Sequence, residues 1–155
     1  MNDIKTYIYL LSDFISTLLQ KKQSIENKVI KDVFAMGQIE GYLIVLGFIS
    51  QGCKKVSISL NSLGFDESFQ KVAFKCYENE NSQNYKILMQ QIIYFLQKEL
   101  ANKKRIGDLT IKGVHFAYFD AYSILKEQIE FSIDLNPSEF DIAQETAESL
   151  AFVSF

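Results

Sequence analysis

The 155-residue chain contains no tryptophan and has only one proline, one arginine, one histidine and two cysteines. One proline, seven glycines and no Asn-Gly or Asp-Gly pair provide poorly for tight β-hairpins. We therefore expect a mainly α fold, a compact domain of about five to seven helices spanning residues 1–155. This fold leaves room for a small antiparallel hairpin, and an α+β fold is the alternative.

The shortage of arginine argues against nucleic acid as a partner. Arg105 is the only side chain able to form the bidentate fork that binds phosphate and guanine. The net charge of −3 and the pI near 5.2 also leave no strong positive field. We expect neither nucleic acid nor an anionic membrane surface to be bound.

The histidine and cysteines do not form a recognisable metal or redox motif. Cys53 and Cys76 belong to no CxxC pair, and His115 has no clustered cysteine or histidine beside it. Nucleotide-binding and hydrolase motifs such as GxxxxGK[ST] and GxSxG are also missing. We expect no metal, no cofactor and two reduced thiols in a cytoplasmic protein.

The N-terminal segment and the central apolar run are the two stretches that could act as targeting or membrane elements. Asp3 and Asp13 interrupt the apolar N-terminus, and no small-residue cleavage site follows, so we expect no signal peptide. The run Tyr42–Ile49 is much shorter than the about 20 apolar residues that a membrane span needs. These features predict a protein that does not cross a membrane.

Apolar residues spaced by three and four predict two helices in the first third of the chain. The first carries Ile4, Tyr7, Ile8, Leu11, Ile15, Leu18 and Leu19; the second carries Val29, Ile30, Val33, Phe34, Met36, Ile44 and Phe48. Asn2 or Asp3 caps the first helix, which closes at residues 21–23. Ser24 is expected to cap the second helix, which ends near Gly52.

Two further helices are predicted in the second half. One apolar face runs from Tyr85 to Leu100 and predicts a helix there. Asn136, Pro137 and Glu139 form a capping box that begins a last helix running to about residue 150.

Three other segments are ambiguous. Residues Lys55–Leu60 and Ile129–Leu135 alternate apolar and polar positions as strands do. The first segment also fits a helix, because Cys53, Val56, Leu60 and Leu63 recur at helical spacing. The aromatic segment His115–Leu125 favours core packing over an exposed interface.

Gly37 and Gly41 stand four residues apart in the predicted second helix. Each costs about 1 kcal/mol of helix stability relative to alanine, so a compensating close approach of another helix is expected. The neighbour is either the first helix of this chain or a helix of a partner. The apolar content also allows a homodimer through this second helix, and the oligomeric state is left open.

Glu40 and His115 are the two residues that could support chemistry. Glu40 falls between Met36 and Ile44 on the apolar side of the predicted helix, where desolvation would raise its pKa. A structural role, with the carboxylate reaching solvent or a lysine, is the alternative that we favour. We assign no catalytic residue, because no second carboxylate or local motif completes a site.

Acidic residues are concentrated at the end of the chain. The segment 127–155 has seven acids (Glu127, Glu130, Asp134, Glu139, Asp141, Glu145 and Glu148) and no lysine or arginine. On a helix beginning at Pro137, Asp141, Glu145 and Glu148 would share one face, where like charges repel by about 0.2 to 0.5 kcal/mol per pair. A docking face for a basic partner and a simple solvated face both explain this pattern.

The sequence is most consistent with a non-enzymatic protein that binds another protein. Our specific hypothesis is a bacterial immunity protein that neutralises a cognate toxin, with Asp134, Asp141, Glu145 and Glu148 contacting a basic toxin domain. One alternative is a secretion or assembly chaperone or an adaptor, with an apolar groove near Gly37 and Gly41. A second is a small ligand-binding or enzymatic domain that uses Glu40 or His115.

Overall fold

The computed structural model describes residues 3–56, 58, 82–102 and 108–142. Within these ranges lie four α-helices and one short 3₁₀ helix: α1 (Asp3–Glu26), α2 (Val33–Lys55), α3 (Ser82–Leu100), α4 (Leu109–Phe131) and η3 (Pro137–Phe140). The described residues contain no strand, so the mainly α prediction is confirmed, with four α-helices in place of five to seven. The strand alternative for Ile129–Leu135 is wrong, because its first three residues form the last turn of α4.

The boundary between α1 and α2 differs from the prediction. Ser24 lies inside α1, which continues to Glu26, while Val29 and Ile30 are exposed in the connecting loop and belong to neither helix. Asp32 caps α2 instead, because its Oδ1 accepts a hydrogen bond of 2.7 Å from the backbone N–H of Ala35. The cap satisfies one of the amide groups that a helix start leaves unpaired.

Replacement of this cap gives a first testable prediction. We expect Asp32→Ala to lower the free energy of unfolding by about 1 kcal/mol, because the Ala35 amide loses its acceptor. Asp32→Ser keeps an acceptor at the same position and should stay close to wild type. Ser24→Ala in the interior of α1 is the matched control, and both variants are compared by urea unfolding. If Ser24 were the cap, Ser24→Ala would destabilise the protein more than Asp32→Ala.

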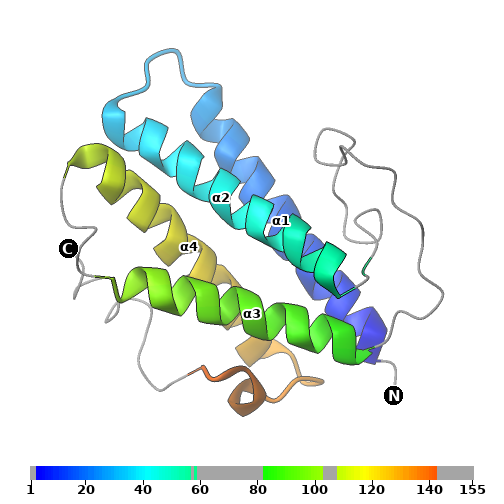
Figure 1. Cartoon of the computed structure of the whole chain (residues 1–155). Coiled ribbons are helices and arrows are strands. Elements are labelled where there is room, and N and C mark those ends of the chain that lie inside the picture. Colours follow the sequence, from blue (N-terminus) through cyan, green and yellow to red (C-terminus); the bar gives the residue numbers. More distant parts are fainter. Residues whose placement is uncertain (1–2, 57, 59–81, 103–107, 143–155) are drawn as a thin grey trace.

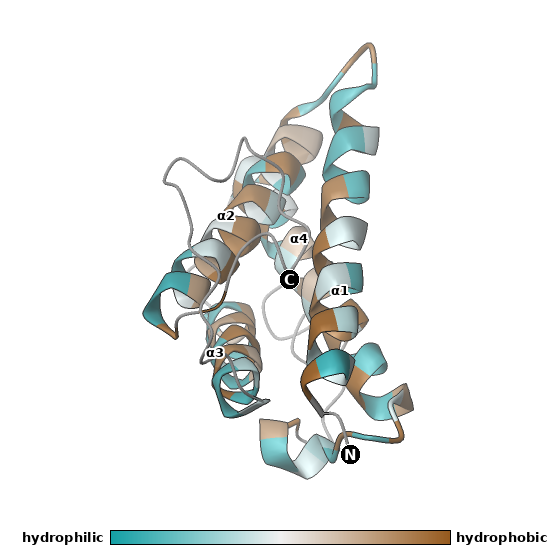
Figure 2. Ribbon diagram, turned by 90° about the vertical axis from the view of Figure 1, so that its right-hand side faces the viewer, coloured by the Kyte–Doolittle hydropathy of each residue, from teal (hydrophilic) through white to brown (hydrophobic). Residues whose placement is uncertain are grey.

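The helices form a small bundle in which α1 and α2 run antiparallel (Figure 1). Helix α4 lies alongside α2, and α3 crosses near the end at which α1 begins and α2 ends. Hydrophilic residues cover the outer side of α1, whereas hydrophobic residues extend along much of α2 (Figure 2). Each of the four helices contacts the other three, and α2 and α4 together form the largest contact of the bundle.

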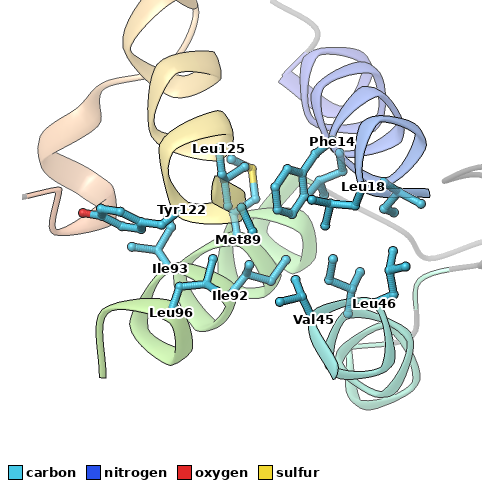
Figure 3. Close-up of a cluster of buried hydrophobic side chains, with 14 of the residues drawn as sticks. Phe14, Leu18, Val45, Leu46, Met89, Ile92, Ile93, Leu96, Tyr122 and Leu125 are labelled. Carbon is cyan, nitrogen blue, oxygen red and sulfur yellow. The ribbon is translucent and has the colours of Figure 1, made fainter. Parts of the chain in front are cut away.

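All four helices contribute side chains to one hydrophobic core (Figure 3). Phe14 and Leu18 of α1 point toward α3 and α4, and they meet side chains from the other helices there. The remaining labelled residues come from α2 (Val45, Leu46), α3 (Met89, Ile92, Ile93, Leu96) and α4 (Tyr122, Leu125). The predicted stripe on α3 is buried in full, which confirms the helix from Tyr85 to Leu100.

Helices α2 and α4 make the most extensive contact in the bundle, and glycines allow their backbones to meet. A Cβ atom added at Gly37 would overlap the carbonyl oxygen of Thr110, and one added at Gly113 would lie 2.9 Å from the amide nitrogen of Gln38. At Gly41 the added atom would lie 2.6 Å from Cβ of Ala117. The neighbour of Gly37 and Gly41 within the chain is therefore α4, and the expectation of the first helix was wrong.

A polar cluster joins α1, α2 and α4 beside this contact. Tyr42, which is 2% exposed, donates a hydrogen bond of 2.7 Å from its hydroxyl to Asp120 Oδ2. Lys21 Nζ approaches the same oxygen at 3.0 Å. Burial, followed by the hydrogen bond and charge of Asp120, raises the pKa of Tyr42 far above its usual value.

By length and composition alone, α2 is the one described helix that could cross a membrane. Its most apolar 18-residue window has a mean hydropathy of 1.6, and 44% of that window is buried inside the structure. Core helices of globular proteins have the same composition, because they are surrounded by other elements. The contacts of α2 with α1, α3 and α4 account for its buried side.

Candidate functional site

The structure separates the residues first considered for chemistry. Glu40 is exposed on α2, so it does not lie in the apolar environment that its sequence position predicted. His115 is buried in α4, and neither residue lines the three surface depressions found on the described residues. Cys53 is buried in α2, whereas Cys76 lies outside the described residues. No group of three or more potential metal ligands occurs within the described part of the chain.

The predicted acidic face is only partly described, and its helical basis is wrong. Asn136 caps the segment through Ser138 N as expected, but η3 ends at Phe140 after one turn. Asp141 then adopts a left-handed conformation with φ of 53°. It therefore does not continue a helix from Pro137 toward Glu145 and Glu148, which lie outside the described residues.

Contacts from α3 explain why this helix stops early. The side-chain amide of Gln90 donates to the carbonyl oxygen of Glu139 at 2.8 Å, and that of Gln97 donates to the carbonyl oxygen of Asp141 at 2.9 Å. Lys86 also pairs with the Glu139 carboxylate. These side chains satisfy backbone acceptors that a continuing helix would have bonded internally.

Asp134 lines a groove between α1 and the end of α4, which we call the α1–α4 groove. The groove has a volume of about 520 Å³. It is lined by Lys5, Thr6, Tyr9, Leu10, Asp13, Gln128, Phe131, Ser132 and Asp134. The α1 residues among them recur at intervals of about one turn, so they form one continuous stripe of that helix.

Two hydrogen bonds connect the walls of the groove. Gln128 Nε2 of α4 donates to Asp13 Oδ2 of α1 at 2.5 Å, and the Thr6 hydroxyl of α1 donates to Asp134 Oδ2 at 3.1 Å. Within the described ranges, neither carboxylate forms an ion pair with a lysine or arginine. Both aspartates are therefore held in place while their negative charge remains available.

Large rings are exposed at the same place. Tyr9 is 80% exposed and Phe131 is 83% exposed, while Leu10 between the helices is buried. Ile133, beside the groove in sequence, is almost completely exposed. Exposed apolar side chains gathered within a polar rim are typical of interaction sites.

The end of α4 makes this region electronegative. Its last turns carry Glu127 and Glu130, both exposed, and the last turn contains no lysine or arginine. The negative end of the helix dipole adds to these charges. Lys126 approaches Glu130 at 3.5 Å, and among the described residues Lys5 is the one cation that lines the groove itself.

A second depression lies along the outer side of α3. It has a volume of about 670 Å³ and is lined by Phe48, Ile87, Gln90, Gln91, Tyr94, Phe95, Gln97, Lys98, Glu139, Phe140 and Asp141. Asp141 thus belongs to this depression, and Asp134 belongs to the α1–α4 groove. The two predicted partner-binding residues that the structure describes do not line the same depression.

Sequence reasoning identified Asp134 but missed Tyr9, Asp13 and Phe131. One feature of the sequence could have identified Tyr9 as an exposed ring. It falls outside the apolar stripe of α1 and must therefore face away from the core. Comparisons of the chain with models of protein families, with curated protein sequences and with solved structures found no match.

Proposed function

We propose that this protein binds another protein that presents a basic surface, and that it performs no catalysis itself. The observation that supports this proposal is the α1–α4 groove, where Asp13 and Asp134 carry negative charge between the exposed rings of Tyr9 and Phe131. Aromatic anchors surrounded by a polar rim are common in protein-binding sites.

The more specific proposal is a bacterial immunity protein that acts in the cytoplasm by occupying the active site of a cognate toxin. Many toxins that act on nucleic acid have basic clefts, and an acidic surface can occupy such a cleft by imitating the charge of the substrate. This step is an analogy based on charge. Complementary charge also speeds association and discriminates against wrong partners.

Asp134 keeps the partner-binding role predicted from the sequence, and Asp13 joins it on the opposite wall of the groove. We propose that Asp141, Glu145 and Glu148 extend the contact beyond the groove. Glu40 and His115 have no part in this proposal.

A chaperone or adaptor is the second candidate, and the outer side of α2 favours it. Val33, Met36, Leu43 and Ile44 are partly or largely exposed there. A binding groove at Gly37 and Gly41 is ruled out, because α4 fills that space. Binding through α2 would depend little on salt, whereas binding through carboxylates weakens steeply as salt rises.

Capture of the natural partner tests the proposal. The tagged protein is purified from its native cells at low salt, and the proteins that accompany it are identified by mass spectrometry. We expect one basic protein, released by moderate salt and bound at least about 30-fold more weakly by Asp13→Lys/Asp134→Lys.

Glu40→Lys is the matched control, because it reverses an exposed charge on another helix. A partner that binds the double variant as tightly as wild type, or that resists salt, would contradict the charge-based proposal. Circular dichroism of each variant establishes that the fold is retained.

A further inference from the structure

We infer that the α1–α4 groove receives a basic amphipathic segment of the partner, with an apolar side chain between Tyr9 and Phe131 and arginine or lysine on Asp13 and Asp134. This inference rests on the proposed protein-binding function and specifies how it is carried out. The groove would therefore recognise an apolar side chain and a cation of the same partner segment together.

The apolar half of the site follows from burial. Tyr9 and Phe131 project from different helices into solvent, while Leu10 forms a buried floor between them. An apolar side chain placed in the groove would remove both rings from water, at about 25 cal/mol for each Å² of apolar surface covered. Tyrosine and phenylalanine in such positions act as binding anchors at a small cost in side-chain entropy.

The charged half follows from the hydrogen bonds across the groove. Asp13 lies one turn after Tyr9 on α1, and Asp134 lies shortly after Phe131, so each ring has a carboxylate beside it. Bonds from Gln128 and Thr6 fix these carboxylates before any partner arrives. Less conformational freedom is then lost on binding, which favours affinity.

The arrangement of charge sets where the basic residues of the bound segment lie. Of the two lining carboxylates, Asp13 lies beside Gln128 at one end of the groove and Asp134 beside Thr6 at the other. Among the described lining residues one ammonium group is present, that of Lys5, which is next to Thr6 in sequence. Basic residues of the segment should therefore flank the apolar side chain on both sides, with the stronger preference for a cation at Asp13, the end away from Lys5. Arginine suits this site better than lysine, because a guanidinium group can stack on Tyr9 while it bonds a carboxylate.

A synthetic peptide tests the inference without the natural partner. The probe is an amphipathic peptide with one tryptophan flanked by arginines one turn away on each side, and its control has glutamates in place of the arginines. Since the protein has no tryptophan, fluorescence of the probe reports binding directly. We expect the arginine probe to bind and the glutamate peptide to bind at least about 10-fold more weakly.

Variants then locate the binding. Tyr9→Ala/Phe131→Ala and Asp13→Asn/Asp134→Asn should each weaken the arginine probe by about 10-fold or more. The matched controls are Tyr94→Ala, which removes a ring that is 67% exposed on α3, and Glu40→Gln, which removes an exposed carboxylate on α2. Both controls should bind the probe as wild type does.

Three results of the peptide experiment would overturn the inference. They are equal binding of the two peptides, unchanged binding of the probe by Tyr9→Ala/Phe131→Ala, and no binding of the arginine probe to wild type. Sedimentation tests a second copy as the occupant: a wild-type dimer that Phe131→Ala converts to monomer would assign the groove to self-association and would also overturn it.

Failure of this inference is distinguishable from failure of the proposed function. A natural partner lost with Asp13→Lys/Asp134→Lys but retained with Tyr9→Ala/Phe131→Ala would preserve the function and reject the aromatic anchors. A probe that binds at the groove while no natural partner is captured would preserve the recognition chemistry and reject the function.

Discussion

Gly37→Ala is expected to lower the free energy of unfolding by about 2 to 3 kcal/mol, although alanine is the better helix former. The added Cβ would overlap the carbonyl oxygen of Thr110 and lie 2.9 Å from the carbonyl carbon. These are backbone atoms of α4, so no side chain can rotate to relieve the overlap. The two helices would have to move apart along their most extensive contact.

Gly47→Ala provides the matched control within α2. No atom lies within 4 Å of a Cβ placed at Gly47, so only the gain in helix propensity remains. This variant should raise the free energy of unfolding by about 0.5 to 1 kcal/mol in urea unfolding. We therefore expect Gly37→Ala and Gly47→Ala to change the free energy of unfolding in opposite directions. Equal changes would reject backbone contact between α2 and α4.

The second large effect appears at alkaline pH and depends on Tyr42. Because its burial and its hydrogen bond to Asp120 raise the pKa of Tyr42, the native state keeps the phenolic proton when the unfolded chain has lost it. Above about pH 10 the unfolded state therefore binds fewer protons, and stability falls by up to about 1.4 kcal/mol per pH unit on account of this group. The contribution is fully present below the unfolded pKa and is lost progressively above it.

Tyr42→Phe isolates this contribution. At neutral pH the variant should be less stable by about 1.5 to 3 kcal/mol, because it loses a hydrogen bond to a charged carboxylate. Between pH 10 and pH 12 (about the range in which unfolded tyrosines ionise) its stability should fall less steeply than that of wild type, so the two unfolding curves converge. Tyr94→Phe removes an exposed hydroxyl and serves as control. Parallel pH dependence of wild type and Tyr42→Phe would contradict the prediction.

The parts of the fold that could be predicted are those with one continuous apolar stripe. Helix α3 matches its predicted buried face, and α1 begins near its predicted cap. Helix α4 was missed because Phe116 and Phe119 interrupt its buried stripe and spread apolar character around the helix. The start of α2 was misplaced because Ser24 and Asp32 are both capable caps, and the choice between them depends on where α2 meets α4.

The candidate site was less predictable, because it belongs to no single element. Asp134 was identified from local charge, but the groove also needs Tyr9 and Asp13 from the opposite end of the chain. The sequence separation of 128 residues between Thr6 and Asp134, which share a hydrogen bond, shows how far apart the two walls are. Only tertiary packing brings them together.

The contact between α2 and α4 also has a consequence for biosynthesis. Tyr42 and Asp120 are 78 residues apart in sequence, so the ribosome must synthesise most of α4 before α2 can find its neighbour. During that interval α2, the most apolar of the described helices, has α1, and later α3, as its neighbours among the described elements. Long-range contacts of this kind form late, and apolar surface left uncovered meanwhile promotes aggregation. Conditions that slow translation of the segment 60–120 are therefore expected to reduce the yield of folded protein more than slow translation of the last residues.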